Sequence, residues 1–269
     1  LQVEHPVTEA ITGLDLVEWQ IRVARGEPLP LAQDEILLVG HAVEARLYAE
    51  DPARDFLPQT GRLTRLAFPE GVRVDTGVEE GDEISRHYDP MIAKLIAHGP
   101  TRAEALARLA VALRATELDG PTTNLGFLER LVGHPGVVGD THDTGFIARE
   151  ADALLAEPPA DERLWIAAAL VRLAREEAEA KRAPADPFSP FATAGAWGLN
   201  VAARRVVTLD DGTAPRTLTF ATDRAGTRLV TPDGALPVAC RLAADRATIT
   251  LGDARFAVTF AEDGDRLTL

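Results

Sequence analysis

Cysteine is scarce in this sequence. Its 269 residues contain one cysteine, Cys240, so no disulfide bond can form within the chain. A single cysteine in an alternating strand pattern is most often a small core residue, and such sparing use is typical of a reducing compartment. Long apolar runs are also missing, because no stretch approaches the ~20 residues that a helix needs to cross a bilayer. The sequence therefore predicts a globular protein with neither a disulfide framework nor a membrane contact.

Positive charge is in short supply as well. The chain has 28 Lys and Arg residues against 42 Asp and Glu residues, which gives a formal net charge of −14 at pH 7. A surface that binds nucleic acid would have to be basic, so we expect no nucleic-acid partner and interpret the acidic surface as an aid to solubility. The hydrophobic content of 46% is typical of soluble globular proteins, and the length fits two domains.

Several common catalytic signatures are missing. The sequence contains no G-x-S-x-G, HExxH or P-loop pattern. Its histidines are scattered without the spacing of metal ligands, so we expect them to be structural and expect no metal site in this chain. They are His5, His41, His87, His98, His134 and His142.

Helix and strand patterns alternate in the first half of the chain. Near the N-terminus, apolar residues recur on one helical face, with Asp15 as the predicted N-cap and Gly26 as part of the stop. This face comprises Leu14, Val17, Ile21 and Ala24. Further on, Thr101 and Glu104 predict the capping box of a second helix, and residues 124–131 predict a shorter one.

Residues 41–48 follow the two-residue period of a strand. One face carries Val43, Ala45 and Leu47, and the other carries Glu44, Arg46 and Tyr48. A strand with one charged face must cover an active site, a partner or solvent.

The pattern changes after Pro158 and Pro159, which mark the predicted domain boundary. Residues 161–182 predict one long helix, which Pro184 and Pro187 end. Its predicted apolar face comprises Leu164, Ala168, Val171, Ala174 and Ala178.

From Leu199 onward, short β-branched runs with a two-residue period predict strands. Turn signals separate them at Asp211-Gly212, Asp233-Gly234, Gly252-Asp253 and Asp263-Gly264. Strands at this spacing predict an antiparallel barrel or sandwich.

The chain opens with LQVEHPVTE, which resembles the second half of the motif E-x-N-x-R-x-Q-V-E-H-P-V-T-E of biotin carboxylase, an ATP-grasp enzyme. Four further blocks follow in the order of that family. They are GHAVEARLYAEDPARDFLPQTGRL (40–63), HYDPMIAKLIAHG (87–99), TELDGPTTNLGFL (116–128) and GDTHDTGFIARE (139–150). The resemblance implies that residues 1–150 are the C-terminal part of a biotin carboxylase domain, cut through an active site.

Residues 151–269 are similar to another module of the same enzymes. A long helix followed by short strands matches the inter-subunit docking (BT) domain of acyl-CoA carboxylase α-subunits, an antiparallel β-barrel around one long helix. The phrase DPFSPFATAGAWGLN (186–200) looks most like the methylcrotonyl-type linker, although Gly198 stands where that type usually has Arg. The resemblance thus implies an α+β protein that joins the two modules.

Site residues follow from the same resemblance. Biotin carboxylase activates bicarbonate with ATP and transfers the CO2 to a ureido nitrogen of biotin. Gln2, Val3 and Glu4 are implied to bind bicarbonate, with Glu4 as the general base. Arg46 is implied to stabilise the enolate-like biotin, and Asp89 to orient Arg46 as its ionic partner in the biotin site.

ATP, biotin and Mg²⁺ or Mn²⁺ are the implied cofactors. The family's phosphate-binding and metal-binding residues lie upstream of this chain, and only Thr144 is implied to border the adenine. The A-M-K-M sequence that carries biotin is absent, so a biotin carrier domain would follow residue 269 in a full subunit.

The implied partners are a carboxyltransferase β-subunit and the biotin carrier domain of the same subunit, in a hetero-oligomer. Such an enzyme is expected in the cytoplasm of a bacterium or in the mitochondrial matrix of a eukaryote. The resemblance favours 3-methylcrotonyl-CoA as the acyl substrate, ahead of propionyl-CoA and geranyl-CoA.

An alternative of another class is a non-catalytic assembly module that only binds a carboxyltransferase subunit. An unrelated ATP-grasp ligase is a third reading, but such a ligase has no need of the last hundred residues.

Overall fold

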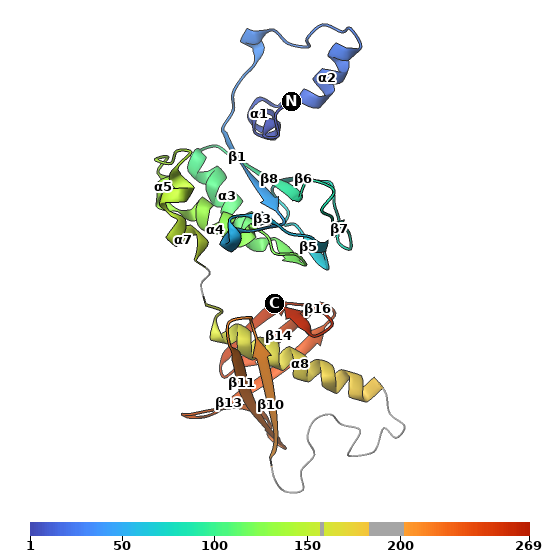
Figure 1. Cartoon of the computed structure of the whole chain (residues 1–269), viewed down its shortest axis with the longest axis vertical. Coiled ribbons are helices and arrows are strands. Elements are labelled where there is room, and N and C mark those ends of the chain that lie inside the picture. Colours follow the sequence, from blue (N-terminus) through green and yellow to red (C-terminus); the bar gives the residue numbers. More distant parts are fainter. Residues whose placement is uncertain (157–158, 183–201) are drawn as a thin grey trace. The chain divides into compact units, whose positions relative to one another are not determined.

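The computed structural model describes residues 1–156, 159–182 and 202–269. The chain divides into two compact units, Leu1–Glu157 (unit 1) and Pro158–Leu269 (unit 2), each with helices and antiparallel strands (Figure 1). The fold class is therefore α+β, as the sequence predicted. Within the part of the chain that is described, no helix has the length and apolar character of a membrane span.

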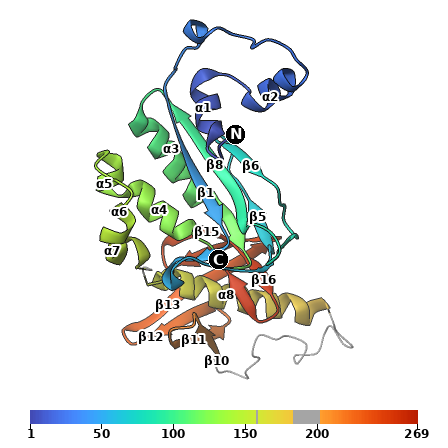
Figure 2. The same cartoon turned by 45° about the horizontal axis from the view of Figure 1, so that its top comes forward.

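Unit 1 is built on a three-stranded antiparallel sheet in the order β1-β8-β6 (Figure 2). Its strands are β1 (His41–Tyr48), β8 (Met91–Gly99) and β6 (Arg73–Thr76). β1 spans the predicted residues, and its burial follows the predicted alternation, because Ala45 and Leu47 are buried.

Short elements precede, connect and follow these strands along the chain. They are the 3-10 helices Gln33–Glu35 and Pro52–Arg54 and the paired strands β2 (Glu50–Asp51) with β3 (Leu57–Pro58), β4 (Gly61–Arg62) with β7 (Glu83–Ile84), and β5 (Arg65–Ala67) with β9 (Glu117–Asp119). Gly120 follows β9 with φ +144°, and a Cβ there would lie 2.4 Å from the carbonyl oxygen of Arg62. This close approach requires glycine.

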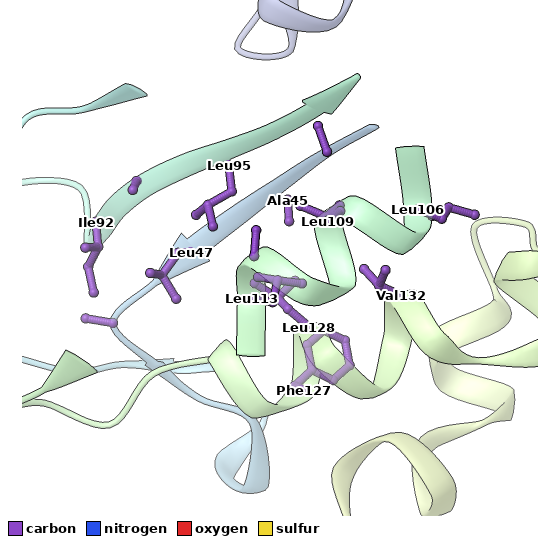
Figure 3. Packing of buried hydrophobic residues seen from close by; sticks show 14 of the residues in the cluster. Ala45, Leu47, Ile92, Leu95, Leu106, Leu109, Leu113, Phe127, Leu128 and Val132 are labelled. Carbon is purple, nitrogen blue, oxygen red and sulfur yellow. The ribbon is translucent and has the colours of Figure 1, made fainter. Parts of the chain in front are cut away.

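One face of the sheet is covered by α3 (Arg102–Ala115), with α4 (Leu125–Gly133) packed against α3 (Figure 3). The hydroxyl of Thr101 accepts a hydrogen bond from the backbone N–H of Glu104 at 3.2 Å, which confirms the Thr101 half of the predicted capping box. Leucines from both helices interdigitate with apolar side chains of β1 and β8 in Figure 3. The core residues labelled there are Ala45, Leu47, Ile92, Leu95, Leu106, Leu109, Leu113, Phe127, Leu128 and Val132. The remaining helices of this region are α5 (Pro135–Val138), α6 (Phe146–Arg149) and α7 (Ala151–Leu155).

The N-terminal segment forms α1 (His5–Thr12) and α2 (Leu16–Ala24). α2 begins at the predicted cap, because the Asp15 carboxylate accepts the backbone N–H of Glu18 at 2.8 Å. No residue of α2 is buried, and the side chains of its apolar face remain largely exposed in unit 1.

Unit 2 contains α8 (Glu162–Arg182). Residues 165–173 are buried almost all round the helix rather than along one stripe, as expected for a helix enclosed by its surroundings. The predicted apolar face is therefore only partly correct. Leu164 is 38% exposed, because it lies before the enclosed segment. The linker phrase 186–200, with Pro187 and Gly198, and Pro184 lie outside the described residues.

A six-stranded antiparallel meander wraps α8, with a separate hairpin after it. The strands are β10 (Ala203–Asp210), β11 (Pro215–Asp223), β12 (Gly226–Thr231), β13 (Gly234–Ala243), β14 (Arg246–Leu251), β15 (Ala254–Thr259), and the hairpin β16 (Ala261–Asp263) and β17 (Arg266–Thr268). Cys240 lies on β13, half-buried against the core, where burial raises the pKa of its thiol to about 11. This cysteine is therefore a poor nucleophile at neutral pH.

Candidate active site

Charged side chains occupy the face of the β1-β8-β6 sheet that points away from α3. The strand register places Arg46 opposite Lys94 and Lys94 opposite Asp75, so these three residues form a row across the sheet. Glu44 lies two residues before Arg46 on β1, and Arg73 lies two residues before Asp75 on β6, and strand alternation puts both on the same face. We call these five residues the charged face.

The N-terminal end of α1 is attached to the charged face, and Figure 2 shows α1 and α3 on opposite sides of β1 and β8. Nη2 of Arg46 lies 2.9 Å from Oε2 of Glu4. Nζ of Lys94 donates a hydrogen bond to the backbone carbonyl of Val3 at 3.0 Å. Glu4 therefore contacts strand β1 through Arg46, and Val3 contacts the neighbouring strand β8 through Lys94.

A second attachment lies one turn further along α1. Nη1 of Arg73 donates to Oε2 of Glu9 at 2.7 Å, and the other oxygen of the buried Glu9 carboxylate accepts the backbone N–H of Leu16. Arg73 also donates to Asp75 at 2.8 Å. Burial alone would raise the pKa of Asp75, but hydrogen bonds and charges from Arg73 and Lys94 outweigh burial, and the pKa is lowered.

Glu44 is the most buried carboxylate of the charged face, with a side chain 5% exposed. Its Oε1 lies 3.4 Å from Nε of Arg46, while its Oε2 has no hydrogen-bond partner among the described residues. Burial raises the pKa of Glu44, although the hydrogen bond from Arg46 and the charge of Lys94 act in the opposite direction. Arg46 is thus held between a buried and an exposed carboxylate.

The backbone of β1 beside Arg46 is fixed by Asn124, which is 5% exposed. Its Nδ2 donates to the carbonyl of Arg46 at 3.1 Å, and its Oδ1 accepts the N–H of Tyr48 at 2.9 Å. Sequence reasoning missed Asn124 and Lys94. The available signals were an asparagine directly before an apolar helix and a single formal charge inside the apolar run MIAKLIAHG.

The structure corrects the predicted partner of Arg46. Among the described residues, Arg46 forms ion pairs with Glu4 and Glu44 and none with Asp89. Asp89 lies in the loop before β8, where its Oδ1 accepts the N–H of Met91 at 2.8 Å. The pKa of Tyr48 is raised mainly by burial of its own side chain, and the negative charge of Asp89 raises it further.

Gln2 and Thr144 make fewer contacts. The carbonyl of Gln2 accepts a hydrogen bond from the His5 backbone N–H at 3.3 Å, and its side chain is exposed. Thr144 is exposed in the loop before α6, and within the described chain it has no hydrogen bond to Gln2, Glu4 or Arg46. The structure therefore brings together Val3, Glu4 and Arg46, while no hydrogen bond among the described residues links Thr144 to them.

The geometry supports anion binding with proton transfer. Arg46 and Lys94 place two cations next to each other under α1, and the side chains of Arg46 and Glu4 are 39% and 51% exposed, so a small solute can reach them. A carboxylate beside a guanidinium can accept a proton from an anion that the guanidinium holds. Within residues 1–156, 159–182 and 202–269, no cluster of three His, Cys, Asp or Glu residues could hold a metal ion.

Family comparisons assign both units. Residues 44–149 match the biotin carboxylase C-terminal domain, and residues 160–269 match the BT domain of the methylcrotonyl-CoA carboxylase α-subunit. Residues 1–32 match the ATP-binding domain of the carbamoyl-phosphate synthase L chain.

Curated relatives agree with these assignments. The mitochondrial methylcrotonoyl-CoA carboxylase α-subunit of Mus musculus is 42% identical over 233 residues, which cover 84% of this chain and 32% of the mouse protein. The α-subunit of Oryza sativa subsp. japonica is 54% identical over 158 residues, which cover 58% of this chain and 21% of the rice protein. The chain thus spans about a third of the length of the mouse relative.

Solved structures resemble part of the chain. The biotin carboxylase domain of the Hydrogenobacter thermophilus 2-oxoglutarate carboxylase, in complex with MgADP, ADP and bicarbonate, has a TM-score of 0.57 and 36% identity, and covers 59% of this chain and 35% of that chain. A complete pyruvate carboxylase from Rhizobium etli has a TM-score of 0.55 and 37% identity, and covers 66% of this chain and 18% of that chain.

These matches follow the same order along the chain as the sequence blocks. By these matches the chain consists of domains found in biotin-dependent carboxylases. More particularly, it joins the C-terminal region of a biotin carboxylase domain to a BT domain of the kind found in methylcrotonyl-CoA carboxylase α-subunits. The resemblance read from the sequence is confirmed.

Proposed function

We propose that this chain acts within the biotin-carboxylating α-subunit of an acyl-CoA carboxylase. The subunit carboxylates biotin with ATP and bicarbonate, and a partner transfers the carboxyl group to an acyl-CoA, 3-methylcrotonyl-CoA in the first place. The observation that carries this proposal is the occurrence of both module matches, in family order, on one chain. We assign residues 1–150 to the carboxylase module and residues 151–269 to the docking module.

Bicarbonate is held by the segment before α1. The side-chain amide of Gln2 and the backbone N–H of Val3 donate to its oxygens, and Glu4 accepts its proton as general base. Support comes from the placement of Glu4, which lies 2.9 Å from Arg46 and is half-exposed, so bicarbonate can reach it.

Arg46 stabilises the negative charge that develops on biotin when its ureido nitrogen becomes a nucleophile. A guanidinium remains charged at all relevant pH values and presents several donors in one plane. Support comes from the constraint on Arg46, whose backbone is fixed by Asn124 and whose side chain lies against Glu44. Asp89, exposed in the loop before β8, contributes to the biotin site from there.

ATP and Mg²⁺ are the remaining reactants and cofactors we assign to the full subunit, with Mn²⁺ as a possible replacement for Mg²⁺. When bound, ATP supplies the phosphoryl group that activates bicarbonate. The described residues contain neither a phosphate-binding loop nor a metal-binding cluster. Thr144 borders the adenine in this assignment, and its exposed position is compatible with that role.

Unit 2 docks on a carboxyltransferase β-subunit, and the carboxylase module receives the biotin carrier domain of its own subunit. Exposed features of unit 2 support docking, since Val206 on edge strand β10 is 63% exposed and unpaired strand edges are available to a partner. A groove of about 660 Å³ also runs between α8 and the β16–β17 hairpin, and the buried Trp165 lines it.

Propionyl-CoA is the second candidate for the acyl substrate. It is favoured by one observation, a 49% identity to the propionyl-CoA carboxylase α chain of Ruegeria pomeroyi over 172 residues. Acyl-chain choice resides in the β-subunit in either case.

The full enzyme works in the mitochondrial matrix if its source is a eukaryote, and in the cytoplasm if its source is a bacterium.

The test is co-elution with candidate β-subunits. The 269-residue chain and its residues 155–269 are each mixed with methylcrotonyl-, propionyl- and geranyl-type β-subunits and separated by size. We expect both to co-elute with the methylcrotonyl type. Co-elution with the propionyl type alone would overturn the substrate assignment, and co-elution with none of the three would overturn docking.

A further inference from the structure

Lysine is rare in this chain, and one lysine lies in the middle of the charged face. Of the 28 Lys and Arg residues, only Lys94 and Lys181 are lysines. The side chain of Lys94 is 11% exposed, and its position on β8 lies between Arg46 and Asp75 in the strand register. A chain that uses arginine almost everywhere else therefore keeps a compact ammonium group at this largely enclosed position.

The position of Lys94 is electrostatically unfavourable. Like charges directly opposite each other on neighbouring strands destabilise a sheet, and Lys94 stands opposite Arg46. Nearby carboxylates offset this repulsion, since Asp75 lies 3.6 Å from Nζ and Glu44 is close enough for the charge of Lys94 to affect its pKa. A second cation beside Arg46 thus needs a specific reason.

The contact with α1 supplies that reason. Nζ of Lys94 donates to the carbonyl oxygen of Val3 at 3.0 Å, 91 residues away in the sequence. The peptide that carries this oxygen also carries the N–H of Glu4, so the hydrogen bond fixes the plane of the Val3–Glu4 peptide bond. An ammonium with three rotatable donors can reach the carbonyl while it faces Asp75, whereas a planar guanidinium is longer and more restricted.

We propose that Lys94 is a positioning residue for bicarbonate, which holds the Gln2–Glu4 segment over Arg46 through the Val3 carbonyl. The inference rests on the proposed function of that segment and deepens it. Lys94 touches neither bicarbonate nor biotin in this assignment. It lowers the cost of binding bicarbonate because the segment is ordered before the ligand arrives.

The experiment uses the full-length α-subunit with Lys94→Met and Lys94→Arg, and Arg22→Met as the matched control. Arg22 also loses one positive charge in this variant, but it lies on the exposed α2, where it pairs with Glu18. Hydrogen exchange of the α1 amides measures the anchor, and the KM values for bicarbonate and ATP measure its consequence.

For Lys94→Met we expect faster exchange in α1 and a bicarbonate KM raised roughly tenfold to a hundredfold, the loss typical of one hydrogen bond to a charged group. The KM for ATP stays within about twofold, since the contact does not reach a nucleotide in this assignment. Lys94→Arg restores part of both effects, and Arg22→Met behaves as the wild type. A merely structural role would lower the amount of active enzyme, and therefore kcat, without changing KM.

Unchanged α1 exchange in Lys94→Met would overturn the proposal. Faster exchange with an unchanged bicarbonate KM would overturn its second step, and would place the failure in the assigned role of Gln2–Glu4. A wild-type subunit without biotin carboxylation would contradict the proposed function itself, while the exchange measurement would still test the anchor. Should Lys94→Met fail to fold, Asp75→Asn removes the counter-ion of Lys94 and is expected to shift exchange and KM in the same direction by a smaller factor.

Discussion

Glu4 and Arg46 are 42 residues apart in the sequence, yet their side chains form an ion pair of 2.9 Å between the start of α1 and strand β1. Both side chains are more than a third exposed, and an exposed ion pair contributes only about 0–1 kcal/mol. A substrate anion can therefore separate the two groups at little cost. The pair keeps the proposed base and the proposed enolate-stabilising group within reach of one small molecule.

Replacement of Arg46 by alanine in the full-length subunit tests its proposed role. We expect biotin carboxylation to fall by roughly 10²–10³, because loss of one transition-state donor costs about 2.7–4 kcal/mol, while ATP binding changes much less. Arg46→Lys recovers little, because a point charge lacks the planar fork. The measurement is carboxylation of free biotin at saturating ATP and bicarbonate, with ATP affinity measured separately. Near-normal turnover in the alanine variant would remove Arg46 from the mechanism.

The 269-residue chain on its own is expected to be inactive. Its sequence contains no phosphate-binding loop, and catalytic groups that act as a unit retain little rate when part of the unit is missing. The check is bicarbonate-dependent phosphate release by the purified chain, compared with a blank without protein and with the full-length subunit. Release above the blank would show that these residues alone suffice for ATP cleavage.

Local patterns in the sequence predicted most elements of the fold. β1, the Thr101 cap of α3 and the Asp15 cap of α2 follow from two-residue alternation and from side-chain oxygens that accept backbone N–H groups. The predicted stripe on α8 was less accurate, because the sheet buries most of the helix circumference between residues 165 and 173, while Leu164 and Arg172 remain exposed.

The site was harder to predict, because its contacts join residues far apart in the chain. The family motif selected Glu4 and Arg46, but their contact with each other depends on how α1 lies on the sheet. The expected Arg46–Asp89 pair is not among the ion pairs of the described residues, in which Arg46 pairs with Glu4 and Glu44 while the Asp89 carboxylate accepts a backbone N–H in its own loop. Lys94 could not be linked to Val3 from spacing, since 91 residues separate them.

Asn124 provides a test of the support beneath Arg46. Asn124→Ala leaves the Arg46 carbonyl and the Tyr48 N–H without their side-chain partner, so the free energy of unfolding of unit 1 should fall by about 1–3 kcal/mol. The measurement is urea unfolding of the 269-residue chain, with the transition of unit 2 as an internal reference. The matched control is Gln33→Ala on the exposed surface, expected to change stability by less than about 0.5 kcal/mol. Equal effects of the two substitutions would contradict the assigned support.

The last prediction concerns the buried carboxylate of Glu44. Burial raises its pKa in the folded protein above the ordinary value of 4.5, so the folded state binds more protons than the unfolded state between these two pKa values. The stability that Glu44 contributes is therefore fully present below about pH 4.5 and is lost as the pH rises through the folded pKa. Glu44→Gln cannot titrate, and its stability relative to the wild type should increase from pH 4.5 to pH 7.5.

Urea unfolding of unit 1 at several pH values measures this difference, again with unit 2 as the internal reference. Glu18→Gln is the matched control, because Glu18 also pairs with an arginine but its side chain is 51% exposed and lies on α2. We expect its difference from the wild type to change less with pH than that of Glu44→Gln. A Glu44→Gln difference that shrinks as the pH rises would mean that Arg46 and Lys94 outweigh burial, and that Glu44 is stabilised as a carboxylate.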